Sequence, residues 1–285
     1  MGSRGTLGDA ATPDGPVAPG TLIIQPIACR KDNYAYLIRD SESRDAYLVD
    51  PTQAAPCEAA LSQGDLILRG ILATHHHHDH VGGIAELVQR WSDSLAFVAG
   101  HAGDRGRIPH QTLFADAPSD RFVATDRLVA GRTLIARHVP GHTRWAMAWG
   151  LAERDQGPVP SEVFTGDTLF GAGCGRLFEG TPAQMWTSMA AFASLPNATR
   201  LWFGHEYTRT NLRFAATLEP DNQAMAARIL EMDAFPAAST TPTTVVLERA
   251  TNPFMRAPSV EVLAQHRAAK DRFDAASKGR SDVRL

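Results

Sequence analysis

The feature that most constrains this chain is a run of five histidines and one aspartate at positions 75–80. It follows a short apolar stretch, Ile71–Thr74, and precedes a segment, Val81–Trp91, whose apolar residues recur at helical spacing. An internal run of this kind, interrupted by Asp79, differs from a polyhistidine tag. Five imidazoles buried without a partner would be costly, and they would repel one another if protonated. We therefore predict that the run binds metal ions.

The spacing within the run indicates two sets of ligands. His75 and His77 alternate in an extended segment, so both side chains point the same way and can reach one ion. Asp79 and His80 come after the turn and can face a second ion. Imidazole and carboxylate groups suit zinc, iron or manganese, and a zinc site takes about four ligands, so other segments must contribute. The candidates, each directly after a glycine at the end of a strand-like run, are His142, Asp167 and His205.

The composition favours a globular protein that acts on a small molecule. Hydrophobic residues make up 44% of the 285 residues, which is enough to bury a core. A formal net charge of −3 and the lack of a basic stripe argue against binding to nucleic acid or to an anionic membrane. Three scattered cysteines favour a reducing compartment, so we expect a cytoplasmic protein. We also expect a monomer. Residues 1–20 contain no apolar signal region and are expected to form a disordered tail.

Short β-rich runs and amphipathic patterns alternate along the chain, which predicts an α/β core followed by a helical C-terminal region. Strands are predicted at Leu22–Ile27, Asn33–Arg39, Ala46–Val49, Ile71–Thr74, Ala96–Val98, Leu134–Val139, Ala146–Leu151, Glu162–Thr165 and Leu201–Phe203. Helices are predicted at Val81–Trp91, at Thr181–Ser194, within Pro220–Met232, and from Ser259, as N-cap, to about Ala276. We expect the boundary between core and helical region near Trp202–Thr210.

An ordered set of motifs resembles the metallo-β-lactamase fold superfamily and, within it, the glyoxalase II or hydroxyacylglutathione hydrolase family. The histidine run with Val81-Gly82-Gly83 specifies only the superfamily. The longer likeness rests on Pro140–Thr143, Phe164–Arg176, Glu179–Thr181, Gly204–Thr208, Asn252–Arg256 and Arg267-x-x-Lys270-Asp271. This resemblance implies a metallo-β-lactamase-like αββα sandwich as a catalytic domain over residues 21–205. It also implies a C-terminal helical substrate-binding region over residues 206–285.

The resemblance also implies a role for each candidate ligand. One ion would be held by His75, His77 and His142, the other by Asp79, His80 and His205, and Asp167 would bridge the two. We expect zinc, with iron or manganese as alternatives, and a catalytic role for Asp79 and Asp167. Asp50 resembles the family's carboxylate that orients a metal-bound histidine. On sequence alone, a plain turn aspartate before Pro51 explains it equally well.

Substrate contacts are implied at Arg176, Phe178, Tyr207, Arg267 and Lys270. Arg176 keeps the positive charge of a family lysine, whereas Phe178 lacks the hydroxyl of a family tyrosine. Arg267 and Lys270 lie three residues apart on one predicted helix and can jointly meet a carboxylate. Without the resemblance, this pair would be interpreted as a solvated helix face. Two further departures from the family pattern are His78, where tryptophan is commoner, and Arg144-Trp145-Ala146, where relatives continue with a Gly-His pair.

The function implied by the resemblance is hydrolysis of a glutathione thioester such as S-D-lactoylglutathione, a 2-hydroxyacylglutathione, to a 2-hydroxy acid and glutathione. A lactonase or β-lactamase of the same superfamily is one alternative, and a persulfide dioxygenase with a single iron is another. A metal-binding module without activity is the third. Retention of all seven ligands, together with Arg267 and Lys270, favours the thioester hydrolase.

Overall fold

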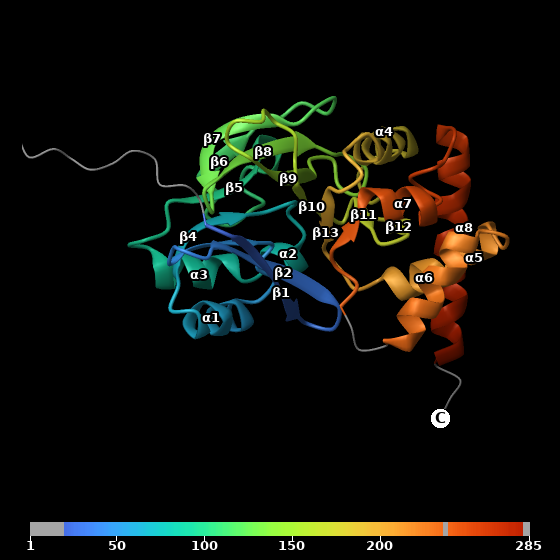
Figure 1. The fold of residues 1–285 in the computed structure, drawn as a ribbon, viewed down its shortest axis with the longest axis horizontal. Helices are drawn as coiled ribbons and strands as arrows, with labels where there is room; N and C mark the ends of the chain where they lie inside the picture. Colours follow the sequence, from blue (N-terminus) through green and yellow to red (C-terminus); the bar gives the residue numbers. More distant parts are fainter. Residues whose placement is uncertain (1–19, 236–238, 282–285) are drawn as a thin grey trace, which may run out of the picture.

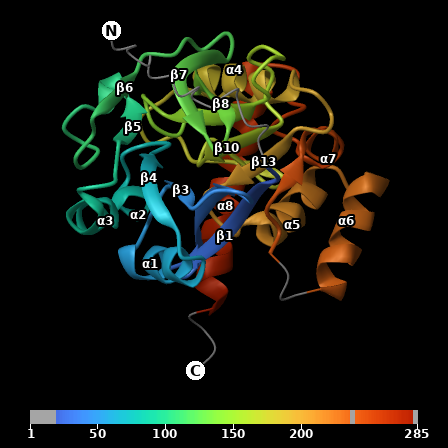
Figure 2. The same cartoon turned by 60° about the vertical axis from the view of Figure 1, so that its left-hand side comes forward.

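The computed structural model describes residues 20–235 and 239–281, which form two sheets packed face to face with helices on both outer sides (Figures 1 and 2). The first sheet has the strand order β1-β2-β3-β4-β5-β6. Its strands are β1 (Leu22–Cys29), β2 (Asn33–Asp40), β3 (Asp45–Val49), β4 (Ile67–Leu72), β5 (Phe97–His101) and β6 (Leu113–Ala115). The pairs β1–β2 and β2–β3 are antiparallel, and the remaining pairs are parallel.

The second sheet has the order β14-β13-β10-β9-β8-β7 and is antiparallel except for β10 and β13. Its strands are β7 (Val123–Val129), β8 (Arg132–His138), β9 (Met147–Ala152), β10 (Glu162–Gly166), β13 (Arg200–Phe203) and β14 (Thr243–Thr244). A small hairpin of β11 (Leu169–Phe170) and β12 (Gly173–Cys174) follows β10. Because β14 comes from beyond residue 206, the helical C-terminal part is joined to this sheet by strand pairing.

Helices cover the outer face of each sheet. The first sheet carries α1 (Ala54–Gln63) and α3 (Ile84–Trp91), with the four-residue helix α2 (His78–Val81) at its edge, and the 3-10 helix η1 (Ala102–Asp104) follows β5. The second sheet is covered by α4 (Pro182–Ala193), α5 (Thr208–Leu218), α7 (Val245–Thr251) and α8 (Val260–Ser281). The remaining helix, α6 (Gln223–Ala234), packs on α5. In the part of the chain described, no helix is both long and apolar enough to cross a membrane.

The core between the two sheets explains why several strands are apolar on both faces. In β2, Tyr34, Tyr36 and Ile38 pack toward the second sheet, whereas Ala35 and Leu37 face α1 and α3. Alternate residues of a strand point to opposite sides, so a strand buried on both faces needs apolar residues throughout. A hydrogen bond also joins the two sheets near the histidine run: Trp149 Nε1 donates to the carbonyl oxygen of Ala73 (2.9 Å).

The αββα sandwich and the C-terminal helical region are confirmed. The helix predicted over Val81–Trp91 is wrong at its start, because helix α2 takes in Asp79 and His80 and a break at Gly82-Gly83 separates it from α3. A Cβ on Gly83 would lie 2.6 Å from the carbonyl oxygen of Pro51, so this close approach admits only glycine. The predicted tail lies outside the described residues, apart from Gly20.

Candidate active site

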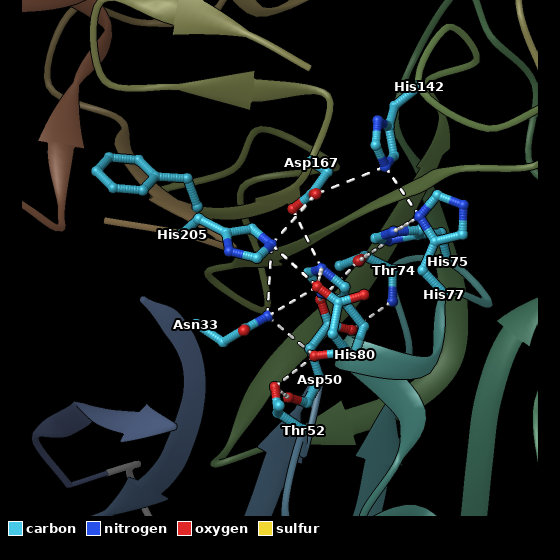
Figure 3. Close-up of polar contacts among 12 residues, drawn as sticks. Asn33, Asp50, Thr52, Thr74, His75, His77, His80, His142, Asp167 and His205 are labelled. Carbon is cyan, nitrogen blue, oxygen red and sulfur yellow. Dashed lines mark hydrogen bonds and ion pairs between the residues drawn. The ribbon is translucent and has the colours of Figure 1, made fainter. Parts of the chain in front are cut away.

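The seven predicted ligands converge at one edge of the sandwich, although they come from four separate segments that follow strands of both sheets. Figure 3 labels six of them: His75, His77, His80, His142, Asp167 and His205. The histidine run follows β4 of the first sheet, whereas His142, Asp167 and His205 follow β8, β10 and β13 of the second. Crowding at this edge explains the preceding glycines. A Cβ on Gly204 would lie 2.4 Å from Asp167 Oδ1, and Gly166 has a φ of +51°.

His75, His77 and His142 form the first group. The Nδ1 atom of His77 lies 3.1 Å from Nε2 of His75 and 3.1 Å from Nε2 of His142. Burial, aided by neighbouring histidines, lowers the pKa of His77 to about 4 and the pKa of His75 well below its usual range. Burial lowers the pKa of His142 as well. The three rings are therefore neutral near pH 7, and neutral imidazole is the form that ligates a metal.

Asp79, His80 and His205 form the second group, and Asp167 lies between the two. Asp167 Oδ1 is 3.2 Å from His80 Nε2, while its Oδ2 is 3.4 Å from His205 Nε2 and 3.5 Å from His142 Nε2. Burial alone would lower the pKa of His80 and His205, but the charge of Asp167 and hydrogen bonds to carboxylates raise them to about 10 and about 11. The negative field that attracts a proton to each Nε2 equally attracts a cation, which competes for the same lone pair.

Three of the histidines are oriented by an acceptor behind the ring. Each acceptor is a carboxylate or carbonyl oxygen, so the histidine Nδ1–H must donate and Nε2 is left to face the centre. The pairs are His80 with Asp50 Oδ2, His142 with the carbonyl of Arg176, and His205 with Asp32 Oδ1, each at 2.9 Å.

Among the described residues, the buried atoms His80 Nε2 and Asp167 Oδ1 face each other at 3.2 Å but form no hydrogen bond. Buried polar atoms are almost always hydrogen-bonded, so a cation that both atoms ligate would satisfy them. Asp50 also lies within ligand distance of His75 and His80. Its oxygens, however, already accept hydrogen bonds from the amide and the hydroxyl of Thr74 (2.7 and 2.6 Å) as well as from His80. Asp50 therefore orients the site from behind.

The other two histidines of the run lie away from this centre. His76 faces Asp104 (3.1 Å from Nδ1) and Glu179 (3.5 Å from Nε2), and His78 is exposed in α2. Two residues at the turn from β1 to β2 were not predicted: Asp32, in the turn, and Asn33, the first residue of β2. The amide of Asn33 donates to the backbone carbonyl of Asp79 (3.0 Å) and to its Oδ2 (3.1 Å). Nothing in a turn sequence of this kind signals such contacts.

A cleft of about 1100 Å³ opens beside the two groups. Phe178, with 64% of its surface exposed, places the edge of its ring against His77 and His142, and Tyr207 stacks on His205 with the ring centroids 4.8 Å apart. All five predicted substrate contacts line the cleft: Arg176, Phe178, Tyr207, Arg267 and Lys270. Lining residues that were not predicted include Lys31, Asp32, Arg107, Glu179, Glu206, Thr210, Asn211 and Asp274.

One end of the cleft is basic. Arg267 and Lys270 on α8 are 6% and 5% exposed, so the interpretation of this pair as a solvated helix face is wrong. Arg267 Nη1 donates to the carbonyl of Cys174 (2.7 Å), which ties α8 to the β11–β12 hairpin. Burial raises the pKa of the Cys174 thiol to about 11, so the thiolate needed for nucleophilic attack is scarce near pH 7.

The departure at Arg144-Trp145-Ala146 has a structural account. The ring of Trp145 stacks on His101 and His138, with centroids 4.8 and 5.7 Å away, and fills the space beside η1. The amide of Arg144 donates to Glu179 Oε2 (3.0 Å) at the wall of the cleft. This segment therefore packs against the wall of the cleft and does not contact the two groups of predicted metal ligands.

Comparison with known proteins assigns the family. Residues 31–205 match the family model of the Metallo-beta-lactamase superfamily, and residues 206–278 match that of the Hydroxyacylglutathione hydrolase C-terminus. A hydroxyacylglutathione hydrolase from Synechococcus sp. is 43% identical over 258 residues, which cover 85% of this chain and 96% of that protein. The chain belongs to the hydroxyacylglutathione hydrolase family. A Gloeobacter violaceus member of the family is 40% identical, over 88% of this chain and 100% of its own length.

Solved structures agree with the fold of the hydroxyacylglutathione hydrolase family. ETHE1 from Myxococcus xanthus superposes with a TM-score of 0.59 over 86% of this chain and 90% of its own, at 22% identity, a likeness that concerns the fold alone. TTHA1623 in a di-iron-bound form gives a TM-score of 0.50 at 26% identity, over 84% and 100% of the two chains. The superfamily fold and the two groups of histidine and aspartate ligands suggest metal binding.

Proposed function

We propose that this chain is a hydroxyacylglutathione hydrolase that cleaves S-D-lactoylglutathione to a 2-hydroxy acid and glutathione. The observation that carries the proposal is Asp167, whose two oxygens contact histidines of both ligand groups beside a cleft with a basic end. Membership of a family whose relatives are named hydroxyacylglutathione hydrolases supports the thioester substrate.

The donor set fits two divalent cations. His75, His77 and His142 would hold one, Asp79, His80 and His205 would hold the other, and Asp167, which contacts histidines of both groups, would contribute to each. Zinc is the expected metal, with iron or manganese as alternatives, because the donors are imidazole nitrogens and carboxylate oxygens. When bound, such ions supply the Lewis acidity that lowers the pKa of water toward about 7 and polarises a carbonyl group.

The chain's own residues hold the substrate around this centre. Arg176, Arg267 and Lys270 supply positive charge for the glycine carboxylate of glutathione, and Tyr207 and Phe178 offer ring surfaces beside the ligand groups. Water adds to the thioester carbonyl, the C–S bond breaks, and the sulfur leaves as a thiolate that takes up the proton released by the water. A thiol pKa of about 8.5 makes the thiolate a good leaving group, so no side-chain nucleophile is needed.

These contacts suggest that two parts of the chain have different roles. We propose a catalytic domain over residues 21–205 and a substrate-binding region over residues 206–285, because α8 contributes Arg267 and Lys270 to the cleft. We expect this protein to be a monomer and to act in the cytoplasm. A one-iron persulfide dioxygenase, the main alternative, would leave Asp79, His80 and His205 without an ion at a shared centre.

An anaerobic assay separates the two activities. Zinc-loaded protein should hydrolyse S-D-lactoylglutathione without oxygen, and elemental analysis of the same sample should find close to two ions per chain, as the two ligand groups require. Iron-loaded protein should take up no oxygen when given glutathione persulfide. Oxygen uptake with persulfide and no thioester cleavage in any metal form would overturn the proposed function.

A further inference from the structure

The basic end of the cleft contains a carboxylate that contacts all three of its cations. Asp274, one turn beyond Lys270 on α8, forms a close ion pair with the ammonium group of that lysine. Its second oxygen, Oδ2, lies 3.6 Å from Arg176 Nη2 and 4.0 Å from Arg267 Nη2. Asp274 thus lies within ion-pair distance of all three basic side chains.

The neighbouring Asp271 contacts two of these three cations. It pairs with Arg176 (3.3 Å) and Arg267 (3.0 Å), and 46% of its side chain is exposed. The structure gives it no ion pair with Lys270, whose side chain is only 6% exposed and whose carboxylate partner is Asp274. Burying an ammonium group without a counter-charge is costly, so Asp274 stabilises Lys270 when no ligand is bound.

A carboxylate of a ligand would need the same position. The side chain of Asp274 lines the cleft and is 20% exposed, whereas Asp271 is not among the lining residues. At the basic end of the cleft, Asp274 is therefore the carboxylate that an entering anion meets. Two carboxylates sharing one cation cluster repel each other, and a ligand that binds there must displace Asp274 from Lys270. The short side chain has other staggered rotamers through which it can turn toward the open cleft.

We propose that Asp274 is an internal counter-anion that occupies the carboxylate subsite of the free protein and weakens the binding of ligand carboxylates there. This inference rests on the proposed function, in which the ligand carboxylate belongs to glutathione. The glutathione product keeps the same carboxylate as the substrate, so competition from Asp274 promotes product release as well as limiting affinity. Asp274 thereby sets how strongly the enzyme retains its product.

Calorimetric binding of S-methylglutathione to the zinc-loaded protein tests the role of Asp274. Asp274→Asn keeps the shape and an acceptor oxygen for Lys270 but removes the charge, so the Kd should fall about tenfold, as expected for a charge-assisted interaction. The inhibition constant of glutathione in the hydrolysis assay should fall by a similar factor. The Kd of S-methylglutathione that is amidated at its glycine carboxylate should be the same for Asp274→Asn and the wild-type protein.

Asp271→Asn is the matched control, because it removes a charge from the same cluster without touching Lys270, and its effect on the Kd should be much smaller. Should Asp274→Asn fail to fold, Asp274→Ser carries the same expectation. An unchanged or weaker affinity, or an equal gain in Asp271→Asn, would overturn the role of Asp274 while wild-type hydrolysis leaves the proposed function standing. A wild-type protein that neither binds S-methylglutathione nor cleaves the thioester would overturn both.

Discussion

Asp50 shows how one side chain behind the ligand groups determines their geometry. Its φ of +46° lies in the left-handed region, which aspartate tolerates better than most residues. This conformation ends β3 and directs both carboxylate oxygens toward the histidine run, where they accept from Thr74 and from His80 Nδ1. The hydrogen bond fixes the His80 ring so that its Nε2 faces Asp167. We therefore expect Asp50 to act as a positioning residue.

Asp50→Asn should weaken zinc binding by about 10–100-fold, the usual effect of removing an acceptor behind a metal-bound histidine. An asparagine in the same position retains only one acceptor oxygen and adds an amide that cannot accept from His80. The measurement is zinc affinity by competition with a chromophoric chelator. Asp93→Asn, at an exposed position after α3, serves as the control and should leave the affinity unchanged. Equal affinities for all three proteins would mean that Asp50 merely closes the turn.

For individual residues, the sequence predicted those site residues whose local spacing or neighbouring glycine marks them. The alternation of His75 and His77 and the glycine before each later candidate pointed to residues that the structure brings together. Asp32 and Asn33 could not be found in this way. Their contacts with His205 and Asp79 join segments 173 and 46 residues apart, and such contacts depend on how the sheets pack.

Among the helices, α7 has a buried carboxylate that joins the C-terminal part to the wall of the cleft. Glu248 is fully buried, and its Oε2 accepts from the amide of Ala172 (2.8 Å) and from Asn252 Nδ2 (2.9 Å). Its Oε1 lies 2.9 Å from Arg228 Nη1 on α6. Through these contacts α7 holds the β11–β12 hairpin, which contains Cys174 and leads to Arg176.

Glu248→Gln should lower the free energy of unfolding by about 3–5 kcal/mol, because it leaves Arg228 buried without a counter-charge. Urea unfolding measures this loss, and labelling by a thiol reagent followed by mass spectrometry should find Cys174 more reactive as the hairpin loosens. Glu231→Gln on the exposed side of α6 is the control and should change stability by less than about 0.5 kcal/mol. If Glu248→Gln had the same free energy of unfolding as the wild-type protein, the buried ion pair would contribute little to stability.

Element prediction succeeded where an apolar pattern continued along the segment and failed where packing determined the outcome. The helix at Thr181–Ser194, observed as α4 (Pro182–Ala193), was predicted because its pattern is long and begins at a capping residue. The strand predicted at Ile71–Thr74 overlaps β4 (Ile67–Leu72) at only two residues, because its apolar run is short. Helix α1 was not predicted, because three of its four buried residues are small (Ala54, Cys57 and Ala60) and Pro56 falls in its first turn. Strand β7 lacks regular alternation, since its sequence reads Val-Ala-Thr-Asp-Arg-Leu-Val.

Across the whole molecule, the candidate metal centre connects the two sheets. One set of ligands follows β4 in the first sheet, and His142, Asp167 and His205 follow strands of the second. The sheets also share an apolar interface that includes Tyr36, Phe164 and Trp202. A cation held by both sets of ligands binds the folded protein but not the separated sheets, so metal binding contributes directly to folding stability.

Removing the metal should therefore lower the melting temperature of the whole protein. With free zinc roughly 100-fold above its Kd, binding stabilises the folded state by about 2.7 kcal/mol. At roughly 2–4 °C per kcal/mol for a chain of this size, calorimetry should detect a rise of about 5 °C or more on adding zinc to chelator-treated protein. Asp167→Asn, which weakens the contact between the two ligand groups, should show a smaller rise from the same zinc concentration. Identical melting with and without zinc in the wild-type protein would mean that the ligands do not join the sheets through a metal ion.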